Sequence, residues 1–166
     1  MTAAGFEPKT VYVTYIVSTP EKVWQALTTS EFTRKYFWDR TIDIELKRGG
    51  RFELRLPDGR VNVRGKVIEC EPPQKLSFTW QVLWPEEFAK LPECLVSYEI
   101  VPAGGAVRLT MTESHSWDVP EAILSGGRMG WPAVLSGLKS LLETGAAPAI
   151  KTEPPQEMIA AIKKLR

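Results

Sequence analysis

The sequence predicts an α+β fold in which an antiparallel sheet of about seven strands wraps around one long C-terminal helix. Two patterns carry this prediction. Between residues 41 and 111 apolar residues largely alternate with polar ones, the period of strands with one buried face. Between Pro120 and Thr144 apolar residues recur at helical spacing, and so long an apolar stripe needs a large surface to cover. The expected order is one strand, two helices, six strands and the long helix.

The N-terminal part is expected to form one strand and two short helices. The strand covers residues 9–18, where both faces are largely apolar or aromatic. Residues 19–21 (Thr-Pro-Glu) begin the first helix, because threonine caps a helix and proline suits its first position. A second short helix is expected over residues 30–37. Residues 1–8 are expected to be a flexible leader.

Turn signals divide the following segment into six short strands. Residues 49–50 (Gly-Gly), 57–59 (Pro-Asp-Gly), 72–73 (Pro-Pro) and 103–105 (Ala-Gly-Gly) separate the alternating runs. Residues 85–92 form a longer loop. Short strands joined by turns pair antiparallel, and each has one apolar face that needs a cover. The long helix is the element with enough apolar surface to supply it.

The chain is expected to be one domain, residues 9–144, followed by a tail at 145–166. The tail contains a short amphipathic helix with an apolar stripe that includes Met158 and Ile162. This stripe is expected to dock on the domain or on a second copy of the chain in a homodimer.

Composition excludes several classes of function. The net charge is +1, with 21 basic and 20 acidic residues spread along the chain, so no basic stripe indicates nucleic-acid binding. No apolar run approaches the roughly 18 residues of a membrane span. One histidine and two distant cysteines do not indicate a metal site, and no cofactor motif is present. The N-terminus lacks the apolar stretch of a secretory signal, which favours a cytoplasmic protein.

Several segments, in order and spacing, resemble a known family. They are Thr19–Trp24 (TPEKVW), Asp43–Phe52 (DIELKRGGRF), Gly65–Glu69 followed by Pro72, Leu76–Trp80 (LSFTW) and Gly130-Trp131 before the leucine-spaced helix. Together they resemble the family named after the C-terminal domain of the heat-shock-protein-90 ATPase activator, in the START-like (SRPBCC, Bet v-like) helix-grip superfamily. The resemblance implies a helix-grip fold with a cavity between sheet and long helix. Members are usually small bacterial proteins of unassigned function, and many are thought to bind apolar ligands.

The resemblance does not imply chaperone activation. The full-length activator resembles this chain in one half only, and its further chaperone-binding domain has no counterpart here. The favoured function is therefore the binding of a small apolar ligand. The alternative is an interaction module, either a chaperone partner or a dimeric subunit. A cyclase- or dehydratase-type enzyme is a third hypothesis, and no residue is assigned as catalytic.

Aromatic and long apolar side chains on the inner face are the candidates for the cavity wall. Phe52 and Phe78 suit an ordinary core, whereas Trp80, Trp84 and Trp117 lie near strand ends, where wide rings also suit a pocket wall. The full candidate set is Trp38, Phe52, Phe78, Trp80, Trp84, Tyr98, Met111, Glu113, His115, Trp117, Met129, Trp131 and Leu135.

Glu113 and His115 continue the inward register of the last strand. Three interpretations stay open: both side chains reach solvent at the cavity mouth, both orient a ligand, or they form a catalytic acid–base pair. Residues two apart on a strand lie about 7 Å apart, so direct contact between the two side chains is not expected without bending.

Gly126, Gly127 and Gly130 interrupt the start of the long helix, where each costs about 1 kcal/mol relative to alanine. Either the regular helix begins only near Gly130, with a loop before it, or the glycines form a flexible gate at the cavity entrance.

Overall fold

The computed structural model describes residues 4–166 and contains one sheet and four α-helices. The strands are β1 (Glu7–Ile16), β2 (Thr41–Ile44), β3 (Arg51–Arg55), β4 (Val61–Glu71), β5 (Lys75–Val82), β6 (Cys94–Ala103) and β7 (Ala106–His115). The helices are α1 (Pro20–Thr28), α2 (Ser30–Tyr36), the short 3-10 helix η1 (Glu86–Lys90), α3 (Glu121–Thr144) and α4 (Gln156–Lys163).

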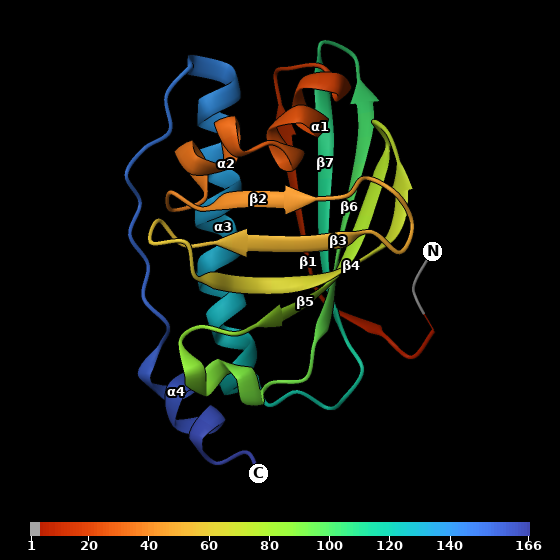
Figure 1. Ribbon diagram of the computed structural model, residues 1–166. Helices are drawn as coiled ribbons and strands as arrows, with labels where there is room; N and C mark the ends of the chain where they lie inside the picture. Colours follow the sequence, from red (N-terminus) through yellow and green to blue (C-terminus); the bar gives the residue numbers. More distant parts are fainter. Residues whose placement is uncertain (1–3) are drawn as a thin grey trace.

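The seven strands form one antiparallel sheet in the order β1-β7-β6-β5-β4-β3-β2, and the predicted helix-grip fold is confirmed. In Figure 1 strands β6 and β7 run along α3 while β2, β3 and β4 cross it, so the sheet bends around the helix. Register shifts in the β3–β4 and β4–β5 pairs mark irregular positions, which increase local twist and allow this bend. Helices α1 and α2 lie at one end of α3 (Figure 1).

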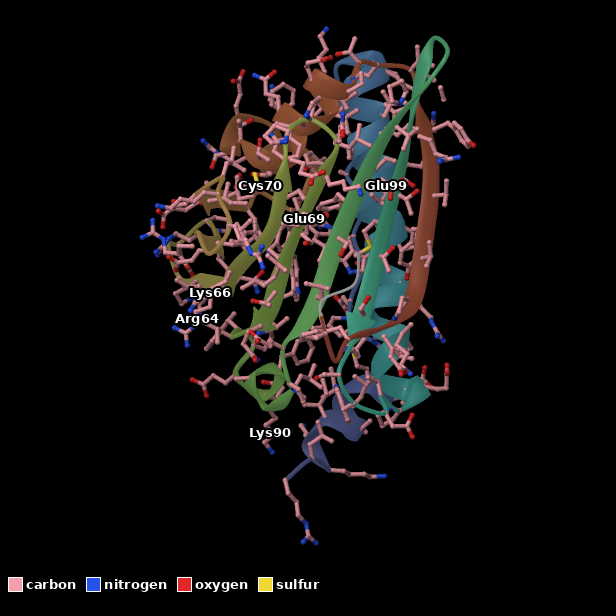
Figure 2. The ribbon with its side chains drawn as sticks, turned by 90° about the vertical axis from the view of Figure 1, so that its right-hand side faces the viewer. Arg64, Lys66, Glu69, Cys70, Lys90 and Glu99 are labelled. Carbon is pink, nitrogen blue, oxygen red and sulfur yellow. The ribbon has the colours of Figure 1, made fainter. Side chains whose placement is uncertain are left out.

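The core lies between the inner face of the sheet and α3. Val107, Leu109 and Met111 of β7 are fully buried, as their alternation with polar residues predicts. Arg64 and Lys66 of β4 are exposed on the outer face, where Figure 2 shows both extending away from the sheet. The hydrophobic face of the sheet therefore points toward α3 and the polar face toward water.

Strand β1 has apolar residues on both faces, but it buries only one of them. Val11, Val13, Tyr15 and Val17 point outward and are 54–66% exposed, whereas Ile16 is fully buried. The strand begins at Glu7, two residues earlier than expected, so the end of the predicted leader belongs to the sheet. Residues 1–3 of that leader lie outside the described residues.

Of the helix starts, that of α1 follows its sequence signal most closely. Thr19 Oγ1 accepts a hydrogen bond from the backbone N–H of Lys22 and caps α1, as predicted. Ser30 does not cap α2; its hydroxyl bonds the backbone of Ile42 and ties α2 to β2. Helix α3 is continuous from Glu121 to Thr144, so the alternative with a loop before Gly130 is wrong.

The tail returns along the domain and docks on it. Residues 145–155 run back beside α3 (Figure 1), and the Trp38 indole N–H donates to the backbone oxygen of Ile150 at 2.9 Å. Met158 and Ile162 of α4 are buried in a second cluster with Phe88 and residues of α3. Across residues 4–166 no helix is long and apolar enough to cross a membrane.

Candidate functional site

A cavity of about 530 Å³ lies between the sheet and the N-terminal half of α3. The C-terminal part of β5, the start of β6, the end of β7, η1 and the tail residues 151–154 complete its wall. Binding sites for small molecules commonly measure about 300–1,000 Å³. This volume is therefore large enough for a small ligand.

Tryptophan dominates the cavity wall. Five of the six tryptophans in the chain line it: Trp38, Trp80, Trp84, Trp117 and Trp131. The sixth tryptophan, in α1, belongs to the packed core instead. The Trp80 and Trp131 rings lie 5.2 Å apart between centroids and bring β5 and α3 together. Wide, flat rings from several elements thus meet around one space.

Three glycines explain why α3 leaves this space open. Gly126, Gly127 and Gly130 all lie on the cavity wall, where they place no side chain. A Cβ on Gly127 would lie 2.7 Å from Glu113 Oε2, which is too close for a real contact. A Cβ on Gly126 would meet the Met158 sulfur at 2.1 Å. At Gly127 a side chain would displace the hydrogen-bonded Glu113 carboxylate, whereas at Gly126 the flexible end of Met158 would have to shift.

Glu113 and His115 are in direct contact inside the cavity. Glu113 Oε1 lies 2.7 Å from His115 Nε2, and Glu113 Oε2 accepts a hydrogen bond from the Trp131 indole at 3.1 Å. The two side chains are only 11% and 10% exposed. The expectation that they would not touch is therefore wrong, and so is the interpretation that both reach solvent.

An irregularity in the sheet lies beside this contact. Strand β1 carries an extra residue opposite β7, since its register shifts between Pro8 and Thr10, which face Ser114 and Glu113. Ser114 is buried as well, which breaks the alternation of the strand at this point. Glu113 and His115 lie on one face of the strand, and both side chains are long enough to turn toward each other.

The Glu113 carboxylate contributes to raised pKa values of two neighbouring side chains, Tyr12 and Cys94. Burial, and to a smaller extent the charge of Glu113, raises the pKa of the Tyr12 hydroxyl, and Arg128 opposes the effect. Burial and then Glu113 also raise the pKa of the Cys94 thiol well above its usual value. Cys94 lines the cavity, and its thiol therefore stays protonated at neutral pH and is a poor nucleophile.

Arg40 is a cavity residue that the sequence analysis did not single out. Its guanidinium carbon lies 5.2 Å from the Trp38 ring centroid and 5.8 Å from that of Phe37. Burial lowers the pKa of Arg40. The residue follows a short turn after α2 and belongs to no periodic pattern, so no sequence signal identified it.

The backbone around Arg40 is held in an uncommon conformation. Trp38 and Asp39 have positive φ angles of 48° and 56°, which cost non-glycine residues on the order of 1 kcal/mol each. The Thr33 hydroxyl donates to the backbone oxygen of Arg40 at 2.8 Å, and Arg34 pairs with Asp39. These contacts hold the turn and place Arg40 at the cavity.

The candidate residues divide between the cavity and the core. Phe52 and Phe78 stack with ring centroids 4.2 Å apart, and both are almost fully buried in the core. Tyr98, Met111 and Leu135 belong to the same packed cluster and do not line the cavity. The candidates that line it are Trp38, Trp80, Trp84, Glu113, His115, Trp117, Met129 and Trp131.

Some wall residues come from elements whose place could not be inferred from the sequence. Asn62 donates from Nδ2 to the backbone oxygen of Trp84 at 2.7 Å and holds the strand end in place. Phe88 of η1 and Met158 of α4 close one end of the cavity. Within residues 4–166 no group of three or more histidine, cysteine or acidic residues could hold a metal ion. The wall thus combines aromatic surface with a carboxylate–imidazole pair, the Arg40 guanidinium and the exposed side chains of Lys151 and Glu153.

Comparisons with known proteins agree with this geometry. Residues 18–143 match the family described as Activator of Hsp90 ATPase homolog 1-like protein, which is more than half of the chain. No curated protein matches the sequence.

Solved structures with the same fold come from several bacteria. Protein MLL2253 from Mesorhizobium loti is 26% identical, with a TM-score of 0.64 over 80% of this chain and 96% of its own. CalU16 from Micromonospora echinospora is 22% identical, with a TM-score of 0.65 over 93% and 80%. The Aha1 dimer from Colwellia psychrerythraea is 20% identical, with a TM-score of 0.64 over 81% and 96%. The last two likenesses show the fold alone.

Proposed function

The chain belongs to the Activator of Hsp90 ATPase homolog 1-like family, and on this premise we propose that it binds a small, largely apolar ligand in the cavity between the sheet and α3. The observation that carries the proposal is an open volume of about 530 Å³ with five tryptophans in its wall. Concave sites of this size with mostly apolar walls and a few polar groups are typical of small-molecule binding sites.

The polar groups in the wall suit a binding site. Apolar pockets commonly use a few polar groups to fix the orientation of a ligand. Glu113, His115 and Trp131 form one connected hydrogen-bonded group at the wall and can act in this way. In this proposal the Glu113–His115 pair orients the ligand and performs no chemistry on it.

The structure gives less support to an interaction module that uses the tail. Met158 and Ile162, which form the centre of the α4 stripe, are 8% and 0% exposed because they pack against η1 and α3 of the same chain. A partner could bind this stripe only after α4 had left the domain.

The proposal predicts that N-phenyl-1-naphthylamine, a neutral apolar fluorescent dye, binds the protein and that Gly130→Leu blocks it. A Cβ at position 130 has no neighbour nearer than 3.8 Å, so a leucine fits there and extends along the cavity wall. We expect the dye affinity to fall by about tenfold or more, because the leucine side chain takes space that the dye needs. Overpacking of this kind costs roughly 1–3 kcal/mol. Fluorescence titration measures it.

Gly130→Ala is the matched control, since it also removes the glycine but adds only a methyl group. Its dye affinity should stay close to that of the unaltered protein. If the unaltered protein does not bind the dye, or Gly130→Leu binds it equally well, the cavity is not a ligand site and the proposal is wrong.

A further inference from the structure

Arg40 carries a positive charge at the cavity that no other described group neutralises. Among residues 4–166 its side chain forms no ion pair and no hydrogen bond. Its Nε is buried without a partner. The rings of Trp38 and Phe37 are its closest electrostatic neighbours, and such cation–π contacts leave the N–H groups of a guanidinium free.

Glu113, by contrast, already has its hydrogen bonds. One carboxylate oxygen contacts His115 and the other accepts the Trp131 indole proton. Glu153 and Lys151 also lie at the wall, but both are exposed to solvent. Of the charged wall residues that the structure describes, Arg40 is therefore the partly buried one without a partner.

The other unpartnered groups of the wall point to the same chemistry. Three buried polar side-chain atoms at the cavity lack a partner among the described residues: Arg40 Nε, Trp117 Nε1 and His115 Nδ1. The first two only donate hydrogen bonds. Buried donors without partners are uncommon in folded proteins. These atoms are closed off from the open volume, so acceptor oxygens of a ligand would reach them after their side chains had turned toward it.

We propose that the ligand is an amphipathic anion, with an apolar body against the tryptophans and a carboxylate, phosphate or sulfonate bound by Arg40. The inference rests on the proposed function and specifies the ligand class of the same site. A guanidinium binds such groups through two parallel hydrogen bonds, which makes arginine suited to recognise them in a partly dry site. The remaining apolar wall accommodates the hydrocarbon or aromatic part.

Two dyes with the same aromatic skeleton test this inference. 8-Anilinonaphthalene-1-sulfonate carries a sulfonate, and N-phenyl-1-naphthylamine lacks it. Arg40→Met should lower the affinity of the sulfonated dye by about tenfold or more, because a charge-assisted hydrogen bond is lost. It should change the affinity of the neutral dye by less than about twofold. Arg40→Lys keeps the charge but loses the two parallel hydrogen bonds, so its affinity for the sulfonated dye should lie between those of the unaltered protein and Arg40→Met.

Arg108→Met is the matched control. It removes the same charge from an exposed position on β7 that does not line the cavity. Both dyes should bind this variant as they bind the unaltered protein. If Arg40→Met weakens both dyes equally, Arg40 only shapes the wall and the inference is wrong.

A measurement on the unaltered protein decides the question without any variant. Decanoate and 1-decanol share one chain and differ in charge, and each can displace the neutral dye. We expect decanoate to displace it at a concentration about tenfold lower than decanol. If both compounds displace the dye equally, the inference of an anionic ligand is wrong but the proposed function still stands. If the neutral dye does not bind at all, the inference and the proposed function are both wrong.

Discussion

Gly127 connects the shape of the cavity to its polar group. A side chain at this position would displace the Glu113 carboxylate, which occupies the space. That carboxylate is in turn held by Trp131, one turn further along α3, and by His115. A residue that looks like a helix breaker in the sequence is thus required by the contact between α3 and β7.

Alanine at position 127 should therefore destabilise the protein, although alanine favours helices. Glu113 must move, and losing a hydrogen bond to a charged group costs about 1.5–3 kcal/mol, more than the roughly 1 kcal/mol that alanine gains over glycine. We expect a net loss of about 1 kcal/mol in the free energy of unfolding. Urea unfolding followed by circular dichroism measures it.

Gly130→Ala provides the comparison for this prediction, because a Cβ there has room. It should gain up to about 1 kcal/mol from helix propensity. Equal stabilisation by both alanines would show that Glu113 moves away at no cost and that its bonds to Trp131 and His115 contribute nothing.

Sequence patterns predicted the contacts of individual side chains less well than the fold. The period of the strand predicted the correct face for Glu113 and His115, but their contact depends on how the two side chains turn, which the period does not specify. The position of Arg40 depends on a turn in which Trp38 and Asp39 have positive φ angles. Neither residue type predicts such a turn. Such features arise from tertiary packing, and a local pattern does not record them.

Among the α-helices, α4 is attached to the domain through a small buried face. It has eight residues and buries only two of them, Met158 and Ile162. A helix this short is unstable alone in water, so its structure depends on docking. Because α4 and residues 151–154 also form part of the cavity wall, its attachment controls how far that side of the cavity is closed.

Ile162→Ala should release α4 without unfolding the domain. Burying an isoleucine contributes about 1.5–3 kcal/mol, so amide hydrogen exchange in α4 should accelerate by about tenfold or more. Exchange in β6, an interior strand of the sheet, should not change. Hydrogen exchange with mass spectrometry measures both.

The exposed Lys163 of the same helix supplies the control, and Lys163→Ala should leave exchange unaltered. If Ile162→Ala accelerates exchange in β6 as strongly as in α4, the tail unfolds together with the domain and is not a separate element.

The ends of helices were predictable where the helical spacing of apolar residues begins or stops next to a residue that suits a helix cap. Helix α1 begins at its threonine cap, and α3 ends at Thr144, where the helical spacing stops and Gly145 adopts a left-handed conformation. The start of α3 was left open because glycines lower helix propensity. Tertiary contacts at Gly126 and Gly127 outweigh that propensity, and the helix is continuous.

At the scale of the whole molecule, the bent sheet and the glycine-rich half of α3 together produce the cavity. The C-terminal half of α3 carries large side chains, such as Leu138 and Leu141, and packs tightly against the core. The N-terminal half faces the opposite end of the sheet and leaves about 530 Å³ open. The period of the strands predicted the fold, whereas the location of the open volume follows from how the elements are stacked.

The position of the tryptophans permits one direct test of ligand binding in this cavity. The chain contains five tryptophans at the cavity wall and one, Trp24, in the core away from it. Their six indole N–H signals can be resolved in a ¹H–¹⁵N correlation spectrum and assigned with single Trp→Phe variants. Titration with N-phenyl-1-naphthylamine should shift the five wall signals and leave the Trp24 signal in place. Six unchanged signals, or a Trp24 signal that moves as far as the others, would contradict ligand binding between the sheet and α3.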